Sequence, residues 1–500
     1  MMLKEFRSLF RETAVYGLST VAGRLLNILL LPLYTHCLTK ADYGIVATVF
    51  AYIAFLNILY AHGMDLAFIR YGCPEKGAEG AKRDFSTPFW SILGLSLSLS
   101  VLVHLAAGPL SRAIGLADWE RVVRCSAWIL ALDAVCLVPF AELRLSHRAS
   151  TFVGIKVANI TAGLGLNYLF VARMGYGVEG VFLATLAASG LTVLFLLPAI
   201  ASKVSAAFDR RLHGELLRFA LPLLPAGIAT MAIQVADRPM LKAFTDDSTV
   251  GLYQANHKLA VFMMMAINMF EMAWRPFYVE RERQPQVKDL LARAMTYFTV
   301  FTAFILLGVS LFLRDIVALP LLHGKALIHP SYWVGLKVAP VVMLGYLLNG
   351  IYYNLNAPVT LAKRTDLIAA ATIAGALANI AANALLIPAW GIMGAAASVV
   401  VAYGTMSALL LHFTRSAYPV AYEYRRLVRV GLVLAAVAAV ALWARVDLKT
   451  GLSGLACKLS LLAAFPLGLA ATGFLDQEER ESLSKAAAKL LGREQPDDGA

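Results

Sequence analysis

Residues 177–200 read GVEGVFLATLAASGLTVLFLLPAI, and residues 391–413 read GIMGAAASVVVAYGTMSALLLHF. Each stretch carries one charged residue or none, and each is long enough to cross the hydrocarbon core of a bilayer, which takes about 20 residues at 1.5 Å per helical residue. Both open with a G-x-x-G element, whose glycines permit a tight turn and close helix contact. The two stretches therefore indicate membrane-spanning helices that recur in the chain.

The composition places the chain in lipid rather than in water. Of its 500 residues, 59% are hydrophobic and 15% are charged, and the mean hydropathy is +0.68. A soluble protein of this length would cover its surface with more charge. The net charge of +12 could suggest nucleic acid, but Lys and Arg also collect in cytoplasmic loops, where they fix the orientation of a membrane protein. We therefore expect a multi-pass membrane protein and no nucleic-acid partner.

Apolar blocks separated by charged or Pro/Gly-rich breaks predict an all-α integral membrane protein with about fourteen transmembrane helices. Lys and Arg concentrate in the N-terminus, the even-numbered loops and the C-terminal tail, which predicts that both termini are cytoplasmic. The blocks lie near residues 12–38, 43–67, 86–107, 122–143, 151–172, 178–200, 216–242, 249–279, 288–313, 331–356, 365–388, 391–413, 424–444 and 452–475.

An internal repeat predicts two related lobes of six helices. The fifth and sixth blocks carry Ala158-Asn159-Ile160 before the turn at 177–180, and the eleventh and twelfth carry Ala378-Asn379-Ile380 before the turn at 391–394. Six helices per repeat is an even number, so both lobes have the same orientation, and a pseudo-twofold axis along the membrane normal should relate them.

A weaker echo pairs Tyr43-Gly44-Ile45 with Val250-Gly251-Leu252, each opening the second helix of its lobe. The predicted division is an N-lobe at 1–200, a cytoplasmic linker at 201–215, a C-lobe at 216–414, a final helix pair at 415–475 and a cytoplasmic tail at 476–500. The five cysteines form no CxxC pair, so we expect free thiols and neither a metal nor a cofactor.

The first block carries a charge at membrane depth. Arg24 lies about 18 Å along the predicted helix at 1.5 Å per residue, and Thr20 and Asn27 share its face. A charged side chain in the bilayer is costly, so it normally faces a cavity or a partner. Arg24 and Asn27 are therefore candidate substrate-binding residues.

The seventh and eighth blocks add a second polar stripe. Gln254 and Lys258 share a face of the eighth block, and Gln234 and Arg238 lie in the seventh. If these helices face one another, the lumen carries surplus positive charge and attracts an anionic group. All four are candidate substrate-binding residues, although Arg238 stands beside Asp237 and could instead be a paired residue.

Four further residues are candidates for coupling transport to protons or sodium, because acids inside membranes often serve as relays. They are Asp65, Glu271, Asp133 and His62. Glu271 has an alternative, since Arg275 stands four residues later on the same helix face. By contrast, Asn57, Asn159, Asn167, Asn379 and Asn383 are expected to bond between helices rather than to touch substrate.

The start of the chain carries Glu12-Thr-Ala-Val-Tyr-Gly-Leu-Ser-Thr20, Arg24, Leu31-Pro-Leu-Tyr-Thr35, Leu38 and Asp42-Tyr-Gly44. These residues resemble the start of bacterial oligosaccharide flippases, and the glycine turns and helix count are similar too. These flippases form the polysaccharide transporter branch of a superfamily that includes the lipid II flippase and the multidrug and toxin extrusion antiporters.

The resemblance implies a non-enzymatic flippase in the bacterial inner membrane. It would move a polyprenyl-diphosphate-linked glycan to the outer leaflet by alternating access, coupled to an ion gradient, with membrane lipid and glycan polymerase or assembly proteins as candidate partners. Arg24 would meet the diphosphate from the first lobe and Lys258 from the second. Similar proteins often carry Arg where this chain has His36, which changes the charge expected at the outer rim.

Two other functions compete with this one. A multidrug antiporter of the same superfamily usually has twelve helices and binds cations through acids, so the extra helix pair and the positive stripe argue against it. A membrane glycosyltransferase or polymerase would need a large outer loop with catalytic acids, whereas the longest outer connection, residues 314–331, carries Asp315 as its single acid. No G-x-x-x-x-G-K-[ST] loop is present in the sequence, which argues against ATP hydrolysis of the P-loop kind.

Overall fold

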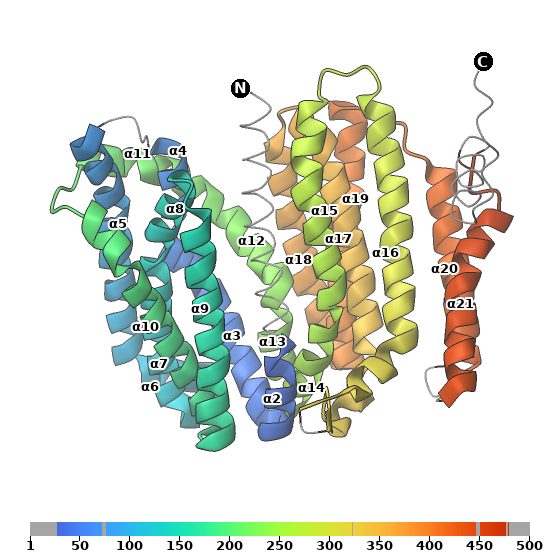
Figure 1. Ribbon diagram of the computed structural model, residues 1–500, viewed down its shortest axis with the longest axis horizontal. Coiled ribbons are helices and arrows are strands. Elements are labelled where there is room, and N and C mark those ends of the chain that lie inside the picture. The colour runs from blue at the N-terminus through green and yellow to red at the C-terminus, as the bar shows by residue number, and fades with distance from the viewer. Residues whose placement is uncertain (1–27, 73–76, 323, 447–450, 477–478, 480–500) are drawn as a thin grey trace, which may run out of the picture. The chain divides into compact units, whose positions relative to one another are not determined.

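The computed structural model describes residues 28–72, 77–322, 324–446, 451–476 and 479 (Figure 1). The described chain is helical apart from one antiparallel hairpin, formed by β1 (Pro320–Leu322) and β2 (Lys325–Ala326). It divides into two compact units. Unit 1 holds the chain up to Glu282 together with Val317–Pro419, and unit 2 holds Arg283–Ile316 together with the chain from Val420 onward.

The first half of unit 1 is here called the N-lobe. Its elements are α2 (Leu30–Cys37), α3 (Lys40–Ala61), α4 (Met64–Tyr71), α5 (Gly77–Leu105), α6 (Ala107–Ala113), η1 (Ala117–Trp119), α7 (Glu120–Val135), α8 (Leu137–Leu145), α9 (Ala149–Asn167), the π-helical η2 (Tyr168–Arg173) and α10 (Gly177–Lys203).

The rest of unit 1 is here called the C-lobe. Its elements are α11 (Arg210–Ala220), η3 (Leu221–Leu223), α12 (Leu224–Val235), α13 (Asp237–Phe244), α14 (Asp247–His257), η4 (Lys258–Ala260), α15 (Val261–Glu280), the hairpin, η5 (Pro330–Gly335), α17 (Val338–Leu361), α18 (Thr365–Trp390) and α19 (Ile392–Ala417).

Unit 2 is built from α16 (Val287–Ala318), α20 (Tyr424–Trp443) and α21 (Gly451–Ala471). An ion pair ties α21 to α16, since the Lys458 ammonium lies 2.5 Å from a carboxylate oxygen of Asp315; the lysine side chain is 2% exposed and that of the aspartate 47%. Arg426 at the start of α20 bonds Glu423 and Glu479. These bonds hold the three helices of the unit together.

Twelve helices of the described chain are long and apolar enough to cross a membrane. They correspond to the second to seventh and the ninth to fourteenth predicted blocks, and the predicted all-α membrane fold is confirmed. The eighth block is helical as well, in α14, η4 and α15, but its polar side chains keep it out of that set. Only the end of the first block, in α2, falls within the described residues.

The lobes meet where α3 and α14 begin, and they meet reciprocally. A Cβ added to Gly44 would lie 1.8 Å from the carbonyl oxygen of Asp247, and one added to Gly251 would lie 2.0 Å from that of Lys40. Asp247 precedes Gly251 by the same number of residues as Lys40 precedes Gly44. The two contacts are therefore equivalent, as a local twofold axis between the helices requires. Only glycine allows two backbones to approach so closely.

The G-x-x-G turns also repeat in detail. Gly177 and Gly391 both adopt positive φ, at 55° and 53°, a conformation that glycine enters without steric cost. Gly180 and Gly394 pack against backbone carbonyls at the end of the preceding helix, those of Phe170 and Leu386. The predicted tight reversals are therefore confirmed in both lobes.

Candidate functional site

A cavity of about 380 Å³ lies in unit 1 and is lined by both lobes. Most of its wall comes from α2, α3, α7, α9 and α10 of the N-lobe, and the C-lobe contributes the junction of α14 and η4. Its polar lining consists of Tyr34, Tyr43, Asp133, Asn159, Asn167, Thr185, Ser189, Gln254 and Lys258. Three of the residues predicted from sequence, Gln254, Lys258 and Asp133, thus face one space.

Lys258 presents the positive charge of this cavity. Its ammonium lies 5.6 Å from the ring centre of Tyr34 and 5.7 Å from that of Tyr43, within range of a cation–π attraction. Within the described chain Lys258 forms no ion pair with an acid. Because aromatic faces stabilise a cation without neutralising it, the lysine stays able to bind an anion.

Hydrogen bonds between helices fix the wall around Lys258. The Tyr34 hydroxyl donates to the side-chain oxygen of Asn167 over 2.7 Å, and the Asn167 amide donates to the carbonyl of Gly163. On the neighbouring turns, the Asn159 amide donates to the hydroxyl of Thr192 over 2.6 Å. The prediction that these asparagines bond between helices is confirmed.

Asp133 brings an acid into the same cavity. The Ser189 hydroxyl donates to its carboxylate over 2.7 Å, and the Lys156 ammonium of α9 interacts with it electrostatically. Lys156 also lies 4.3 Å above the ring of Phe140. Sequence reasoning missed Lys156, although the rule that selected Arg24, a charge inside an apolar block, applies equally to it.

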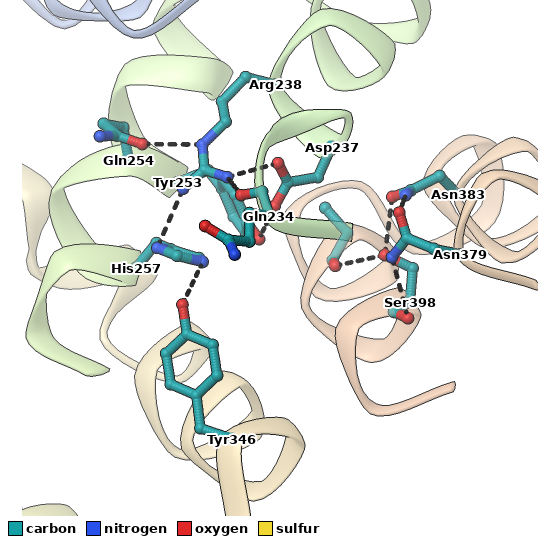
Figure 2. A network of polar contacts seen from close by, with 11 residues as sticks. Gln234, Asp237, Arg238, Tyr253, Gln254, His257, Tyr346, Asn379, Asn383 and Ser398 are labelled. Atoms are coloured by element: carbon teal, nitrogen blue, oxygen red, sulfur yellow. Dashed lines mark hydrogen bonds and ion pairs between the residues drawn. The ribbon is translucent and has the colours of Figure 1, made fainter. Parts of the chain in front are cut away.

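Arg238 lies outside the cavity lining, in a closed network of hydrogen bonds in the C-lobe (Figure 2). Its guanidinium donates to the Asp237 carboxylate over 2.6 Å and to the Gln254 side chain over 3.0 Å. It also bonds the carbonyl of Gln234 and the ring of His257. The side chains of Asp237 and Arg238 are 1% and 7% exposed, so this charge pair is shut away from water.

The network continues from both partners of Arg238. The Tyr253 hydroxyl donates to the second oxygen of Asp237 over 2.5 Å, and the Tyr346 hydroxyl lies 3.4 Å from the far ring nitrogen of His257. Figure 2 shows these residues converging from α13, α14 and α17. The network therefore joins four helices of the C-lobe, α12, α13, α14 and α17, around one charge pair.

A neighbouring cluster joins α18 to α19 (Figure 2). The Asn383 amide donates to the Asn379 side chain over 3.1 Å, and the Ser398 hydroxyl donates to the Asn383 side chain over 2.8 Å. The Asn379 amide donates to the backbone carbonyl of Ser398. These asparagines also bond between helices, as predicted, and Asn379 stands in the sequence repeat where the N-lobe has Asn159.

The remaining candidates do not line this cavity. His62 sits in the break between α3 and α4 with φ of 32°, and its ring bonds the Tyr60 carbonyl and the Ser91 hydroxyl. Asp65 lies in the first turn of α4, and Glu271 lies in α15 near Arg275. Gln234 exposes its side chain and contributes its carbonyl to the Arg238 network.

Two candidates cannot be placed. Arg24 and Asn27 lie outside the described residues, so their assignment to substrate binding stays a prediction. His36, at the predicted outer rim, bonds the carbonyl of Ala326 in the β-hairpin over 2.8 Å.

The two lobes, their reciprocal contact and the cavity that both line define a two-lobed, all-α membrane fold. The structure is similar to the lipid II flippase MurJ in an inward closed conformation, with a TM-score of 0.72 at 15% identity over 91% of this chain and 98% of MurJ. It is also similar to an inward-facing multidrug resistance MATE family transporter, with a TM-score of 0.65 at 14% identity over 78% and 94% of the two chains. A eukaryotic MATE transporter, AtDTX14, gives a TM-score of 0.55 at 15% identity over 83% and 96%.

The chain belongs to the family described as polysaccharide biosynthesis protein, whose model matches residues 35–326. This match and the fold confirm the resemblance to the polysaccharide transporter branch of the superfamily. A comparison with curated protein sequences finds no match.

Proposed function

We propose that the chain is a flippase that moves a polyprenyl-diphosphate-linked oligosaccharide from the cytoplasmic to the outer leaflet of the bacterial inner membrane. The observation that carries the proposal is the Lys258 ammonium, which contacts two aromatic rings and no acid of the described chain, and which faces a cavity lined by both lobes. A diphosphate is a strong acceptor for a lysine of this kind. A charge at this depth with no ligand or partner to stabilise it would destabilise the protein.

The lobe contact supports alternating access. Both termini are expected in the cytoplasm, so the ends of α3 and α14 that meet at Gly44 and Gly251 face outward, and the lobes are closed at that end. In the proposed cycle this contact breaks while the opposite end closes, which exposes the diphosphate to the other leaflet. The lipid tail stays in the bilayer throughout. Arg24 is proposed to supply a second cation to the diphosphate from the first lobe.

The sharpest test is complementation of a strain that lacks the gene. We expect Lys258→Ala and Arg24→Ala to lower surface glycan more than tenfold at equal protein level, and the lipid-linked precursor to accumulate in the inner leaflet. Lys258→Arg and Arg24→Lys should retain part of the activity because they keep the charge. Lys337→Ala, which removes an exposed lysine, is the matched control. Normal surface glycan in both alanine variants would contradict the proposal.

A cation antiporter is the second candidate, and Asp133 is the observation that favours it, since a carboxylate in the cavity is a group that binds cationic drugs. The two functions differ in what Asp133→Asn does. In an antiporter the variant loses drug resistance and leaves surface glycan normal. In the proposed flippase the variant changes the amount of surface glycan and leaves drug resistance unchanged.

A glycan-synthesising enzyme gains no support from Asp315, the acid of the connection at 314–331. Its carboxylate pairs with Lys458 in unit 2, so it is engaged in an ion pair within that unit.

A further inference from the structure

Three tyrosines at the junction of the lobes differ in how their hydroxyl groups are used. Tyr34 of α2 donates its hydroxyl to the side-chain oxygen of Asn167 over 2.7 Å. The hydroxyls of Tyr43 in α3 and Tyr332 in η5 are buried, and neither forms a hydrogen bond with any group of the described chain. Both of these residues are 1% exposed. Unit 1 thus carries two buried phenols at this junction whose hydrogen-bonding capacity is unused.

A buried hydroxyl without a partner needs a physical reason, because it destabilises the fold. The packing of the two rings does not supply that reason, since phenylalanine could occupy the same positions without the hydroxyl. A ligand that provides the missing hydrogen-bond partner would supply it. Where each hydroxyl lies relative to the cavity therefore decides what it can do.

Tyr43 lies beside the positive charge of the cavity. Of the described residues, Tyr43 lines the cavity that holds Lys258, and Tyr332 does not. The Lys258 ammonium lies 5.7 Å from the centre of the Tyr43 ring, so an anion that binds the lysine comes close to the phenol. Aromatic packing holds the ring, whose centre lies 5.7 Å from that of Tyr34 and 6.4 Å from that of Tyr332. Tyr43 therefore combines a fixed ring, an unused donor and a neighbouring cation.

We propose that the Tyr43 hydroxyl is a second hydrogen-bond donor for the phosphate group that Lys258 binds. This inference rests on the proposed function and adds a neutral donor to the ligand site. In the conformation of the structure the hydroxyl is covered, and the ammonium lies against the rings. As Lys258 turns from the rings toward the anion, the phenol is uncovered and donates a hydrogen bond to a phosphate oxygen.

The two donors belong to different lobes. Lys258 comes from η4 of the C-lobe, whereas Tyr43 comes from α3 of the N-lobe. A phosphate group that binds both therefore bridges the lobes, in place of the direct contact between the ammonium and the ring. A hydrogen bond to an ionised acceptor is stronger than one between neutral groups, so the phenol should contribute to affinity although it carries no charge.

The test is binding of farnesyl diphosphate, a short prenyl diphosphate, to the full chain in detergent, compared between wild type and Tyr43→Phe at one pH. The substitution removes the hydroxyl and keeps the ring, so the cation–π contact with Lys258 remains. We expect the Kd to rise about tenfold, while the midpoint of thermal unfolding stays equal to that of wild type or rises. Loss of a purely structural hydrogen bond would instead lower the unfolding midpoint.

The other two tyrosines provide matched controls. Tyr332→Phe removes an equally buried and unused hydroxyl that does not line the cavity in the described chain, so its Kd should equal that of wild type. Tyr34→Phe removes a hydroxyl that bonds Asn167, so its unfolding midpoint should fall. Farnesol, which shares the prenyl chain and lacks the phosphates, should bind wild type and Tyr43→Phe with equal affinity.

The outcomes separate this inference from the proposed function. An unchanged Kd in Tyr43→Phe would overturn the inference and leave the flippase proposal standing. An equal rise of the Kd in Tyr43→Phe and Tyr332→Phe would also overturn it, because the hydroxyls would then act through the contact between the lobes. A lower unfolding midpoint in Tyr43→Phe would overturn it as well, since the hydroxyl would then have a partner in the protein. Failure of wild type to bind farnesyl diphosphate would contradict the proposed function and this inference with it.

Discussion

Two polar regions of unit 1 use buried charge in opposite ways. In the C-lobe network, Asp237 and Arg238 satisfy each other and bond Tyr253, Gln254 and His257. In the cavity, Lys258 has two aromatic rings and no acid of the described chain as partners. Removing charge from the first region should therefore damage stability, whereas removing it from the second should damage ligand binding.

The comparison teaches that depth in the membrane does not by itself identify a ligand-binding charge. Arg238 and Lys258 both lie in apolar blocks of the sequence, and both are charges that a bilayer penalises. The difference is whether the hydrogen-bonding capacity of the side chain is already used. A guanidinium bonded to four groups has little left for a substrate, while an ammonium against two rings keeps its donors.

The largest stability effect is expected for Arg238→Ala. The change leaves the Asp237 carboxylate buried with Tyr253 as its remaining partner, and breaking a buried pair in this way costs about 3–5 kcal/mol. Thermal unfolding of the purified chain in detergent would measure the loss. Arg364→Ala is the control, because its partner Asp366 is 61% exposed and solvent screens the pair. Equal unfolding midpoints for the two variants would refute the distinction drawn above.

A smaller effect is expected for Gly44→Ala, at the contact between the lobes. The added methyl group would overlap the Asp247 carbonyl, and overpacking of this kind costs about 1–3 kcal/mol. This free-energy cost destabilises the state in which the lobes touch, so the lobes should separate more often at that end. A cysteine introduced by Val46→Cys in the cavity wall should then react faster with an impermeant maleimide added outside than it does without Gly44→Ala.

Gly190→Ala is the matched control for that experiment, since nothing lies within 4 Å of the position of its Cβ. It should leave both the unfolding midpoint and the labelling rate unchanged. If Gly44→Ala behaves in the same way as this control, the backbone contact does not hold the lobes together.

The sequence predicted those features that local physics or the bilayer determines. The hydrophobic length of each block follows from membrane thickness, and the turns at Gly177 and Gly391 follow from the conformational freedom of glycine. The echo between Gly44 and Gly251 correctly marked the start of α3 and of α14. The fold class could therefore be predicted from the sequence alone.

The candidate site was predicted only in part, because partners distant in sequence decide what a charge does. Arg238 was a candidate ligand, but its bonds to Gln254 and His257 come from another helix. Lys156 also lies inside an apolar block, but its proximity to Asp133 joins α9 to α7 and is not visible in either block alone. The pairing of Asp133 with Ser189 joins residues on different helices, and no single block could reveal it.

The central claim is that the cavity holds a phosphate-bearing ligand through Lys258, and calorimetry with farnesyl diphosphate tests it most directly. For Lys258→Ala we expect a smaller loss of stability than for Arg238→Ala, because each lost cation–π contact is worth about 0.5–2 kcal/mol and no buried acid is left without its partner. We expect the same variant to weaken binding at least tenfold, with Lys258→Arg close to wild type. Binding that is unchanged in a folded Lys258→Ala protein would contradict the account.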